Sequence, residues 1–174
     1  MFFKVKSSED VFEILRGFDS VPTEKIFIGD SLNRVLGEGI TSGEDMPNFS
    51  RSSVDGYAVQ AKDTFGASDS LPAFLELAGE VEMGKASQNI VGPGTAVRIP
   101  TGGMIPEGAD AVVMIEYCHS VDEKTIEVSR SVAPLENIIS RGDDFRKGSV
   151  LFNKGTVLRP QDIGLLAGLG VKNV

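Results

Sequence analysis

Two loop segments of this sequence carry residues whose types could do chemistry. The first segment, residues 47–59, delivers Asp55 and then Gly56 into the start of an apolar run. Because a glycine leaves the backbone beside it open, the Asp55 carboxylate could act as an acid or as a metal ligand. An Asp-Gly pair is also typical of a turn in which the aspartate bonds its own backbone. The local pattern taken alone favours that turn.

The second segment, residues 98–113, places a glycine-rich loop between two apolar runs. Two prolines stiffen this loop, and its glycines would expose N–H groups that present Thr101 to a phosphate-like ligand. The Gly-Lys-Ser/Thr sequence of a P-loop is missing, so the local pattern favours a tight structural connection. A third segment, residues 141–148, mixes charges as solvated turns between strands do, and we assign it no chemistry.

Composition limits what other chemistry is available. Cys118 and His119 are the only cysteine and histidine, too few for a structural zinc site. With 25 acidic against 17 basic residues the net charge is -8, which argues against nucleic acid and anionic membranes as partners. The start of the sequence lacks the apolar stretch of a signal peptide, and no run approaches the ~18 apolar residues of a membrane span. We therefore expect a cytoplasmic protein.

Helical periodicity appears near the N-terminus. Ser7 precedes four apolar residues on one helix face, and Asp10 can complete a capping box, so the sequence predicts an amphipathic helix over residues 8–17. A shorter helix is expected over residues 31–36. The apolar face of the first helix consists of Val11, Ile14, Leu15 and Phe18.

The middle of the sequence has the pattern typical of a small β-domain, with short apolar or alternating runs broken by Gly, Pro, Asn and Asp. Residues 74–83 alternate apolar residues with glutamates, which predicts a strand with one face on a core and the other in water. The apolar residues of this alternation are Leu75, Leu77, Val81 and Met83. Further strands are expected over residues 95–99 and 125–128. Residues 111–115 are continuously apolar, which is typical of a strand covered on both faces, and the alternative for so short a run is a buried helical turn.

The end of the chain predicts a hairpin and a helix. Residues 149–152 and 156–158 flank a turn in which Gly155 supplies a positive φ. Pro160 then opens a helix whose apolar face would comprise Leu165, Leu166 and Leu169. Residues 171–174 have the pattern of a strand without a partner, so we expect the chain to stop at a domain boundary.

Together these segments resemble one family, the molybdopterin molybdenumtransferases, whose eukaryotic relatives include the molybdenum-inserting domain of gephyrin. The family pattern Pro-x-Phe-x-x-Ser-x-x-Asp-Gly-Tyr-Ala-Val is matched at residues 47–59. The pattern Arg-Ile-x-Thr-Gly-x-x-x-Pro-x-Gly-Ala-Asp-Ala-Val-Val is matched at residues 98–113. Weaker similarity at residues 142–151 and a close match at residues 158–170 extend the resemblance over nearly the whole chain. Asn33 and Gly37 depart from the family pattern without affecting the chemical assignment.

The resemblance implies that this chain comprises two of the family's four domains and that its fold is of the α+β class and mainly β. A β-rich active-site domain, residues 25–140, would be inserted into an elongated dimerisation domain of helical and β-hairpin structure. The two segments of that domain would be residues 1–24 and 141–174, and the chain would form a homodimer. The family's nucleotide- and pterin-binding α/β domain and its small C-terminal β-domain have no counterpart in this sequence.

The resemblance also implies an activity, which is the insertion of molybdate into adenylylated molybdopterin, with Mg²⁺, and release of AMP in molybdenum cofactor biosynthesis. Asp55 and Thr101 would be catalytic residues in a cleft completed by the α/β domain. The carboxylate could hold Mg²⁺ against a pyrophosphate or orient the attacking water, and the sequence leaves both roles open. The residues that the resemblance places at the substrate are Ser53, Gly56, Gly102 and Gly103.

Two other functions compete with this one. A non-catalytic assembly or scaffold protein of the gephyrin type would depend on its dimer and surfaces, and a lone β-domain could bind a small anion. The presence of both Asp55 and Thr101 favours the enzyme, because a scaffold needs neither. We expect this chain alone to be inactive and to self-associate, with Asp55 exposed and Thr101 beside it.

Overall fold

Short β-strands dominate the computed structural model, which describes residues 5–19 and 21–174. The chain divides into two compact units: the terminal unit, residues 1–40 with 151–174, and the β unit, residues 41–150. The domain boundaries expected after residues 24 and 140 therefore differ from this division, which falls after residues 40 and 150.

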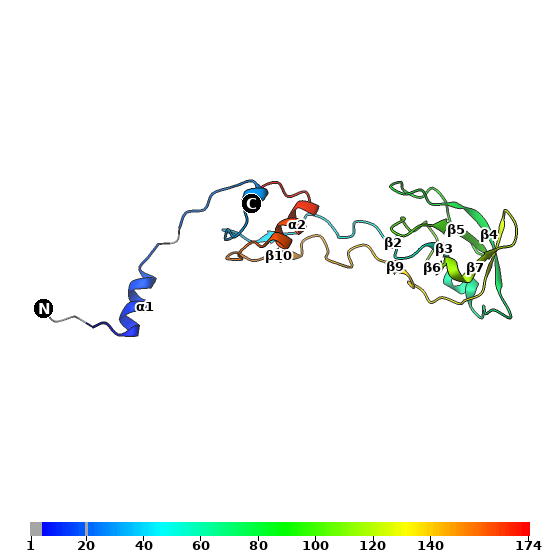
Figure 1. Ribbon diagram of the computed structural model, residues 1–174, viewed down its shortest axis with the longest axis horizontal. Coiled ribbons are helices and arrows are strands. Elements are labelled where there is room, and N and C mark those ends of the chain that lie inside the picture. The colour runs from blue at the N-terminus through cyan, green and yellow to red at the C-terminus, as the bar shows by residue number, and fades with distance from the viewer. Residues whose placement is uncertain (1–4, 20) are drawn as a thin grey trace. The chain divides into compact units, whose positions relative to one another are not determined.

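A curled six-stranded sheet forms the centre of the β unit (Figure 1). The strand order is β6-β3-β5-β4-β8-β7, and the pairs are antiparallel except for β4 with β5. The strands are β3 (Gly56–Val59), β4 (Ala73–Glu80), β5 (Thr95–Ile99), β6 (Ala111–Met114), β7 (Cys118–Ser120) and β8 (Thr125–Val128). Strands β5 and β8 have the bounds that the sequence predicted, and β6 ends one residue earlier than predicted.

The sheet buries apolar side chains in two clusters. Neighbouring residues of a strand point to opposite faces, and Val112 and Val113 of β6 accordingly belong to different clusters. This double burial explains why β6 is continuously apolar. One cluster comprises Val59, Ala61, Leu75, Ala96, Ala111, Val113, Ile126, Val128 and Val132. The other comprises Ala58, Val81, Val91, Val97, Ile99 and Val112.

Strand β4 differs from its predicted alternation. Its pairing with β5 shifts register between Leu77 and Gly79, where one extra residue interrupts the period of two. Leu75 and Val81 therefore enter opposite core clusters, although the sequence assigned them to one face. The strand ends at Glu80, and Met83 is exposed, so its predicted place in the core is wrong.

Three 3₁₀ helices and two small sheets also occur among the described residues. The 3₁₀ helices are η1 (Ile28–Asp30), η2 (Ala61–Thr64) and η3 (Ile115–Tyr117). Strand β1 (Ile40–Thr41) pairs with β10 (Val150–Phe152), and β2 (Arg51–Ser52) pairs with β9 (Ile138–Ile139).

The terminal unit packs a small core around helix α2 (Pro160–Gly168). Pro160 opens this helix as predicted, and Asp162 accepts hydrogen bonds from the Arg159 backbone and guanidinium. Leu166 is fully buried while Leu165 is 37% exposed, so the predicted apolar face is narrower than expected. The core residues of the terminal unit are Ile28, Leu36, Leu158 and Leu166.

The helix predicted over residues 31–36 is wrong. Its backbone groups pair instead with residues distant in sequence: the Leu36 N–H donates to Thr156 and the Leu158 N–H donates to Arg34. These bonds also replace the predicted hairpin, because residues 156–158 pair with residues 33–36. The turn itself forms, with Gly155 at φ +87°.

Residues 171–174 do have a partner, contrary to the sequence-based expectation. The N–H of Val174 donates to the Ile26 carbonyl and the N–H of Ile26 donates back to Val174, both near 3 Å. Asn173 also forms a β-bridge with Phe27. These bonds hold the last residues to the segment that leads into η1.

Helix α1 (Ser8–Arg16) confirms the predicted amphipathic helix and its capping box. The Asp10 N–H donates to the Ser7 hydroxyl at 3.2 Å, and the Ser7 N–H donates to the Asp10 carboxylate at 2.9 Å. No residue of α1 is buried, so its apolar face is open to solvent.

Among the described residues, no helix combines the length and hydropathy that crossing a membrane requires. Residues 1–4, which entered the expectation about a signal peptide, lie outside the described residues.

Candidate functional site

Asp55 and Thr101 are in direct contact, although they come from different loops. The Asp55 Oδ1 atom accepts hydrogen bonds from the Thr101 backbone N–H at 2.7 Å and from the Thr101 hydroxyl at 2.9 Å. Both residues are exposed. The carboxylate thus bonds to the second loop segment rather than to its own turn, and the expected proximity is confirmed.

The register of two strands brings these loops together. Asp55 directly precedes β3 and Thr101 follows the end of β5, and the two strands run antiparallel with Gly56 opposite Ile99. The start of β3 therefore lies beside the end of β5, and the residues just outside the strands meet at one edge of the sheet. The Ile115 N–H donates to the Asp55 carbonyl at 3.0 Å and fixes the backbone from the β6 side.

Gly56 serves the packing of strands. The residue is buried, and a Cβ atom built on it would lie 1.9 Å from the carbonyl oxygen of Val113 on β6. Any side chain would force β3 and β6 apart, and with them the anchor of Asp55. This close packing is sufficient to explain the glycine, and the contact of Gly56 with substrate stays a prediction.

The glycine-rich loop does not form a cradle of free N–H groups. The Gly102 N–H donates to the Ser52 carbonyl at 2.8 Å, and the Gly103 N–H donates to the Pro100 carbonyl at 2.9 Å. The Thr101 N–H is taken by Asp55. These two glycines therefore have no N–H to offer a phosphate, and the alternative of a tight structural connection is correct for them.

Ser52 is a positioning residue to which the sequence analysis gave no role, although the family pattern includes this serine. Its hydroxyl donates to the Val54 carbonyl at 2.6 Å and accepts from the Val54 N–H at 3.2 Å, and its side chain is buried. This serine turn shapes the loop that ends at Asp55, and the serine three positions before the aspartate was the available signal. Ser53, which the resemblance placed at the substrate, is exposed, and its N–H donates to the Asn137 carbonyl at 3.0 Å.

The hydrogen bonds from Thr101 also set the charge of Asp55. The Thr101 N–H, then its hydroxyl, and then the nearby positive charge of Arg98 lower the pKa of the Asp55 carboxyl below its ordinary 3.8, against an opposing effect of desolvation. Asp55 is therefore an anion at neutral pH. An efficient general base has a pKa near the working pH, so the arrangement suits electrostatic or cation-binding roles better.

The acidic residues present could supply one ligand to a magnesium ion. Within the described ranges, no three His, Cys, Asp or Glu side chains gather to hold a metal. Mg²⁺ commonly takes one or two carboxylates and completes its shell with phosphate oxygens and water. The second oxygen of Asp55 accepts no hydrogen bond from the residues described, so Asp55 fits a site of that kind.

The Cys118 thiol is not a nucleophile at neutral pH. Desolvation by burial, followed by the negative charge of Glu116, raises the pKa of the Cys118 thiol to about 12. The thiol is therefore protonated at neutral pH, and its Sγ lies 3.5 Å from the Met114 carbonyl.

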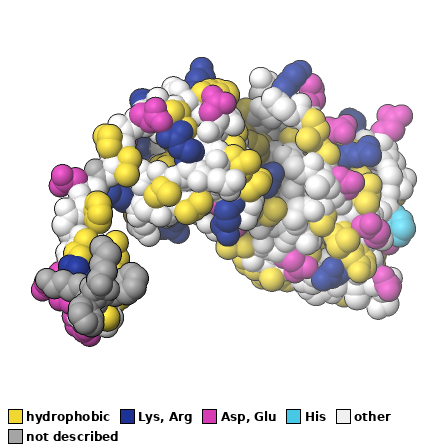
Figure 2. Space-filling model, turned by 60° about the vertical axis from the view of Figure 1, so that its left-hand side comes forward, with side chains coloured by type: hydrophobic (Ala, Val, Ile, Leu, Met, Phe, Trp, Pro, Cys, Tyr) yellow, Lys and Arg dark blue, Asp and Glu magenta, His cyan; other side chains and the backbone are white. Residues whose placement is uncertain are grey.

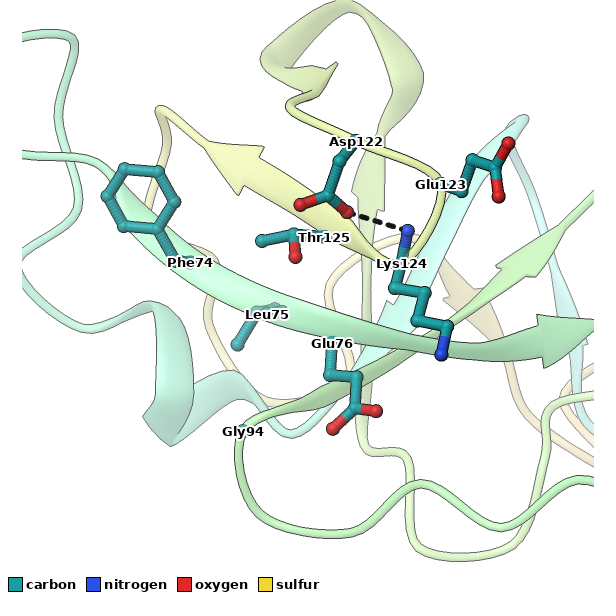
Figure 3. Close-up of a pocket in the computed structure, with 8 residues that line it drawn as sticks. All are labelled: Phe74, Leu75, Glu76, Gly94, Asp122, Glu123, Lys124 and Thr125. Carbon is teal, nitrogen blue, oxygen red and sulfur yellow. Dashed lines mark hydrogen bonds between the residues drawn. The ribbon is translucent and has the colours of Figure 1, made fainter.

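A hollow of about 770 Å³ lies elsewhere on the β unit, where β4 faces the turn between β7 and β8 (Figure 3). Its walls carry three carboxylates and one lysine, and the Asp122 carboxylate accepts the Lys124 backbone N–H at 2.7 Å. None of the residues expected at the site lines it. The lining residues are Phe74, Leu75, Glu76, Gly94, Asp122, Glu123, Lys124 and Thr125.

The charged third segment ties two stretches of the β unit together. The Arg141 guanidinium lies 2.7 Å from the Asp45 carboxylate, and the Lys147 N–H donates to the same carboxylate at 2.8 Å. These bonds, the Lys147 N–H first, hold the pKa of Asp45 below its ordinary value. The segment thus has a structural explanation.

Basic residues are outnumbered by acidic ones, 17 against 25. On the face that Figure 2 shows, Lys and Arg side chains lie singly among Asp and Glu, without a broad basic patch. An anionic ligand would therefore depend on individual cations placed close to its site.

The structure and the site define a class of protein: a mainly β chain that presents an aspartate–threonine pair at one edge of a curled sheet. The family model described as the MoeA N-terminal region, domains I and II, matches residues 6–170. This chain belongs to that family, the N-terminal region of the molybdopterin molybdenumtransferases.

Relatives with known names support this assignment. A putative molybdopterin biosynthesis protein of Methanocaldococcus jannaschii is 39% identical over 173 residues, which cover 98% of this chain and 41% of that protein. The molybdopterin molybdenumtransferase of Bacillus subtilis is 43% identical over 155 residues, 87% of this chain and 36% of the relative. This chain thus spans about two fifths of the length of these relatives.

Two solved structures of the molybdopterin biosynthesis MoeA protein from Pyrococcus horikoshii share the fold. One superposes with a TM-score of 0.82 at 43% identity, over 87% of this chain and 40% of the other. The second gives a TM-score of 0.87 at 36% identity, over 98% of this chain and 44% of the other.

Proposed function

We propose that this chain supplies one wall of the active site of a molybdopterin molybdenumtransferase, which inserts molybdate into adenylylated molybdopterin and releases AMP. The observation that carries the proposal is the Asp55 carboxylate, which Thr101 holds at an exposed edge of the sheet through two hydrogen bonds. The names of the relatives support the same pathway.

In this site Asp55 acts as a fixed negative charge. Thr101 orients the carboxylate and keeps it ionised, so its second oxygen faces the ligand without a change of protonation. A carboxylate beside a pyrophosphate repels it unless a cation lies between them, and Asp55 would supply one ligand to Mg²⁺ there. When bound, Mg²⁺ would neutralise phosphate charge and polarise the phosphoryl group.

The remainder of the site would come from an α/β domain of the enzyme. On this proposal the 174 residues alone do not insert molybdenum, because nothing in them is assigned to the pterin. We further propose a homodimer, since α1 leaves its apolar face uncovered. We also propose that the protein acts in the cytoplasm.

The test is the substitution Asp55→Asn in the full-length enzyme, which keeps the shape and removes the charge. We expect molybdenum insertion to fall at least about 100-fold, with the fold and dimer unchanged. Asp69→Asn is the matched control, because Asp69 is another exposed aspartate of the β unit. Unchanged insertion by Asp55→Asn would overturn the proposal.

The same experiment distinguishes the enzyme from a scaffold protein, the alternative that the exposed apolar face of α1 supports. A scaffold would tolerate Asp55→Asn and lose its cellular role when the apolar face of α1 is made polar. Loss of insertion in Asp55→Asn with an intact dimer would exclude a purely structural role.

A further inference from the structure

Arg98 lies next to the Asp55–Thr101 pair. On β5 it stands directly opposite Tyr57 of β3 and Glu80 of β4. Residues opposite each other in a sheet share a face, and residues two apart along a strand do as well, so Arg98 and Asp55 lie on the same side at this edge. The contribution of Arg98 to the lowered pKa of Asp55 agrees with this proximity.

The guanidinium of Arg98 is held only loosely. Its side chain is 53% exposed, and among the residues described its one ion pair is with Glu80, at 4.0 Å from Nε to Oε1. Glu80 is itself 62% exposed. A long ion pair between solvated side chains contributes little, so a stronger anion can take the place of Glu80.

The exposed guanidinium of Arg98 is open to such an anion. A hollow of about 650 Å³ close to it is lined by Glu80, Val81, Glu82, Met83 and Pro100. Arg98 does not line this hollow, and the two glutamates in its wall make the guanidinium, rather than the hollow, the place for an anion. The planar donors of a guanidinium match phosphate oxygens in pairs. On a chain with a net charge of -8, a local cation is also needed to bring a phosphate close to the Asp55 carboxylate.

We propose that Arg98 binds the pyrophosphate group of the substrate beside Asp55, and that Glu80 holds the guanidinium in position until the substrate displaces it. This inference rests on the proposed function of the same edge of the sheet. It adds a substrate-binding residue to an acid that by itself would repel the pyrophosphate group. In one metal–pyrophosphate ligand, Asp55 then binds the metal ion and Arg98 binds the pyrophosphate.

Binding can be measured without turnover, by calorimetric titration of the 174-residue chain with inorganic pyrophosphate in the presence of MgCl₂. We expect Arg98→Gln to weaken the affinity at least tenfold and Arg98→Lys to restore part of it. Glu80→Gln should bind as tightly as the parent chain or more tightly, because the competing carboxylate charge is gone. In parallel, the NMR signal of the Arg98 Nε–H should shift on titration of the parent chain.

Lys62→Gln is the matched control, because it removes one exposed positive charge beyond the opposite end of β3. It should change the affinity less than twofold. Equal weakening by Lys62→Gln and Arg98→Gln would mean that only net charge matters, and this would overturn the proposal. So would the absence of pyrophosphate binding to the parent chain, or Arg98-dependent binding of molybdate without pyrophosphate.

The full-length enzyme separates this inference from the proposed function. Arg98→Gln should raise KM for adenylylated molybdopterin at least tenfold with a smaller change in kcat, whereas Asp55→Asn should lower kcat. If Asp55→Asn abolishes insertion while Arg98→Gln leaves KM and pyrophosphate affinity unchanged, the inference about Arg98 fails and the proposed function stands. If Asp55→Asn has no effect, the proposed function fails.

Discussion

The β unit and the terminal unit reach their stability in different ways. The β unit buries apolar clusters on a six-stranded sheet, with most of its large core side chains less than 2% exposed. The terminal unit has a core of four residues and a helix, α1, from which nothing is buried. A sheet that closes its own core can position a site by itself, whereas a unit with a small core and exposed apolar residues is suited to contacts with other surfaces.

This difference accounts for the location of the candidate site. Asp55 and Thr101 flank strands that are anchored in both core clusters of the β unit, so their hydrogen bonds rest on a rigid frame. The terminal unit contributes no residue to this pair. Four predictions test the comparison, beginning with the largest expected effect.

Truncating the small core should unfold the terminal unit selectively. Leu166 is fully buried among four core residues, so Leu166→Ala should cost about 2–5 kcal/mol. Hydrogen exchange should show the loss in residues 26–40 and 151–174, while β3 and β5 stay protected. Leu165→Ala, at a 37% exposed position, should cost less than about 1 kcal/mol. Equal loss of protection in both units would show that the chain unfolds as one body.

Adding one methyl group at Gly56 should damage the β unit and its site together. The new Cβ would meet the Val113 carbonyl oxygen at 1.9 Å, so Gly56→Ala should destabilise the β unit by about 1–3 kcal/mol. Gly43→Ala is the control, because no atom lies within 4 Å of the Cβ position there. Chemical denaturation measures the stability. A Gly56→Ala variant as stable as the parent chain would refute the packing role of this glycine.

Removing the cap of α1 should affect that helix alone. Ser7→Ala deletes the acceptor of the Asp10 N–H and should destabilise the helix by about 1 kcal/mol. Backbone chemical shifts of residues 8–16 would report the loss. Ser8→Ala removes a similar hydroxyl that does not cap the helix, and should leave these shifts unchanged. Changes spreading to the β unit would contradict the independence of α1.

The smallest effect concerns the ionisation of Asp55. Thr101→Ala removes the hydroxyl bond and keeps the stronger backbone N–H bond, so the pKa of Asp55 should rise partway toward 3.8. Because the folded pKa is lowered, the stabilisation from ionised Asp55 is present above pH 3.8 and is lost as the pH falls through the folded pKa. Carboxyl NMR titration of Thr101→Ala would measure the shift, with Thr101→Ser as the control. An unchanged pKa in Thr101→Ala would show that the hydroxyl bond is unimportant.

Local interactions decided the elements that the sequence predicted well. The capping box of α1 lies within four residues, Pro160 fits only the start of α2, and the patterns of β5 and β8 show their burial directly. The types of the candidate site residues were also visible in sequence, because an acid before a glycine and a threonine in a glycine-rich loop are features of a few adjacent positions.

Interactions between distant residues decided the rest. Residues 31–36 lost their predicted helix because their backbone groups found partners at residues 155–158, and the extra residue in β4 was invisible without its partner strand. The bond between Asp55 and Thr101 crosses 46 positions and exists because β3 and β5 share a register. Hydrogen-bond partners and register depend on which strands become neighbours in space, so the sequence by itself determined the chemical groups of this protein and only the tertiary structure decided which of them meet.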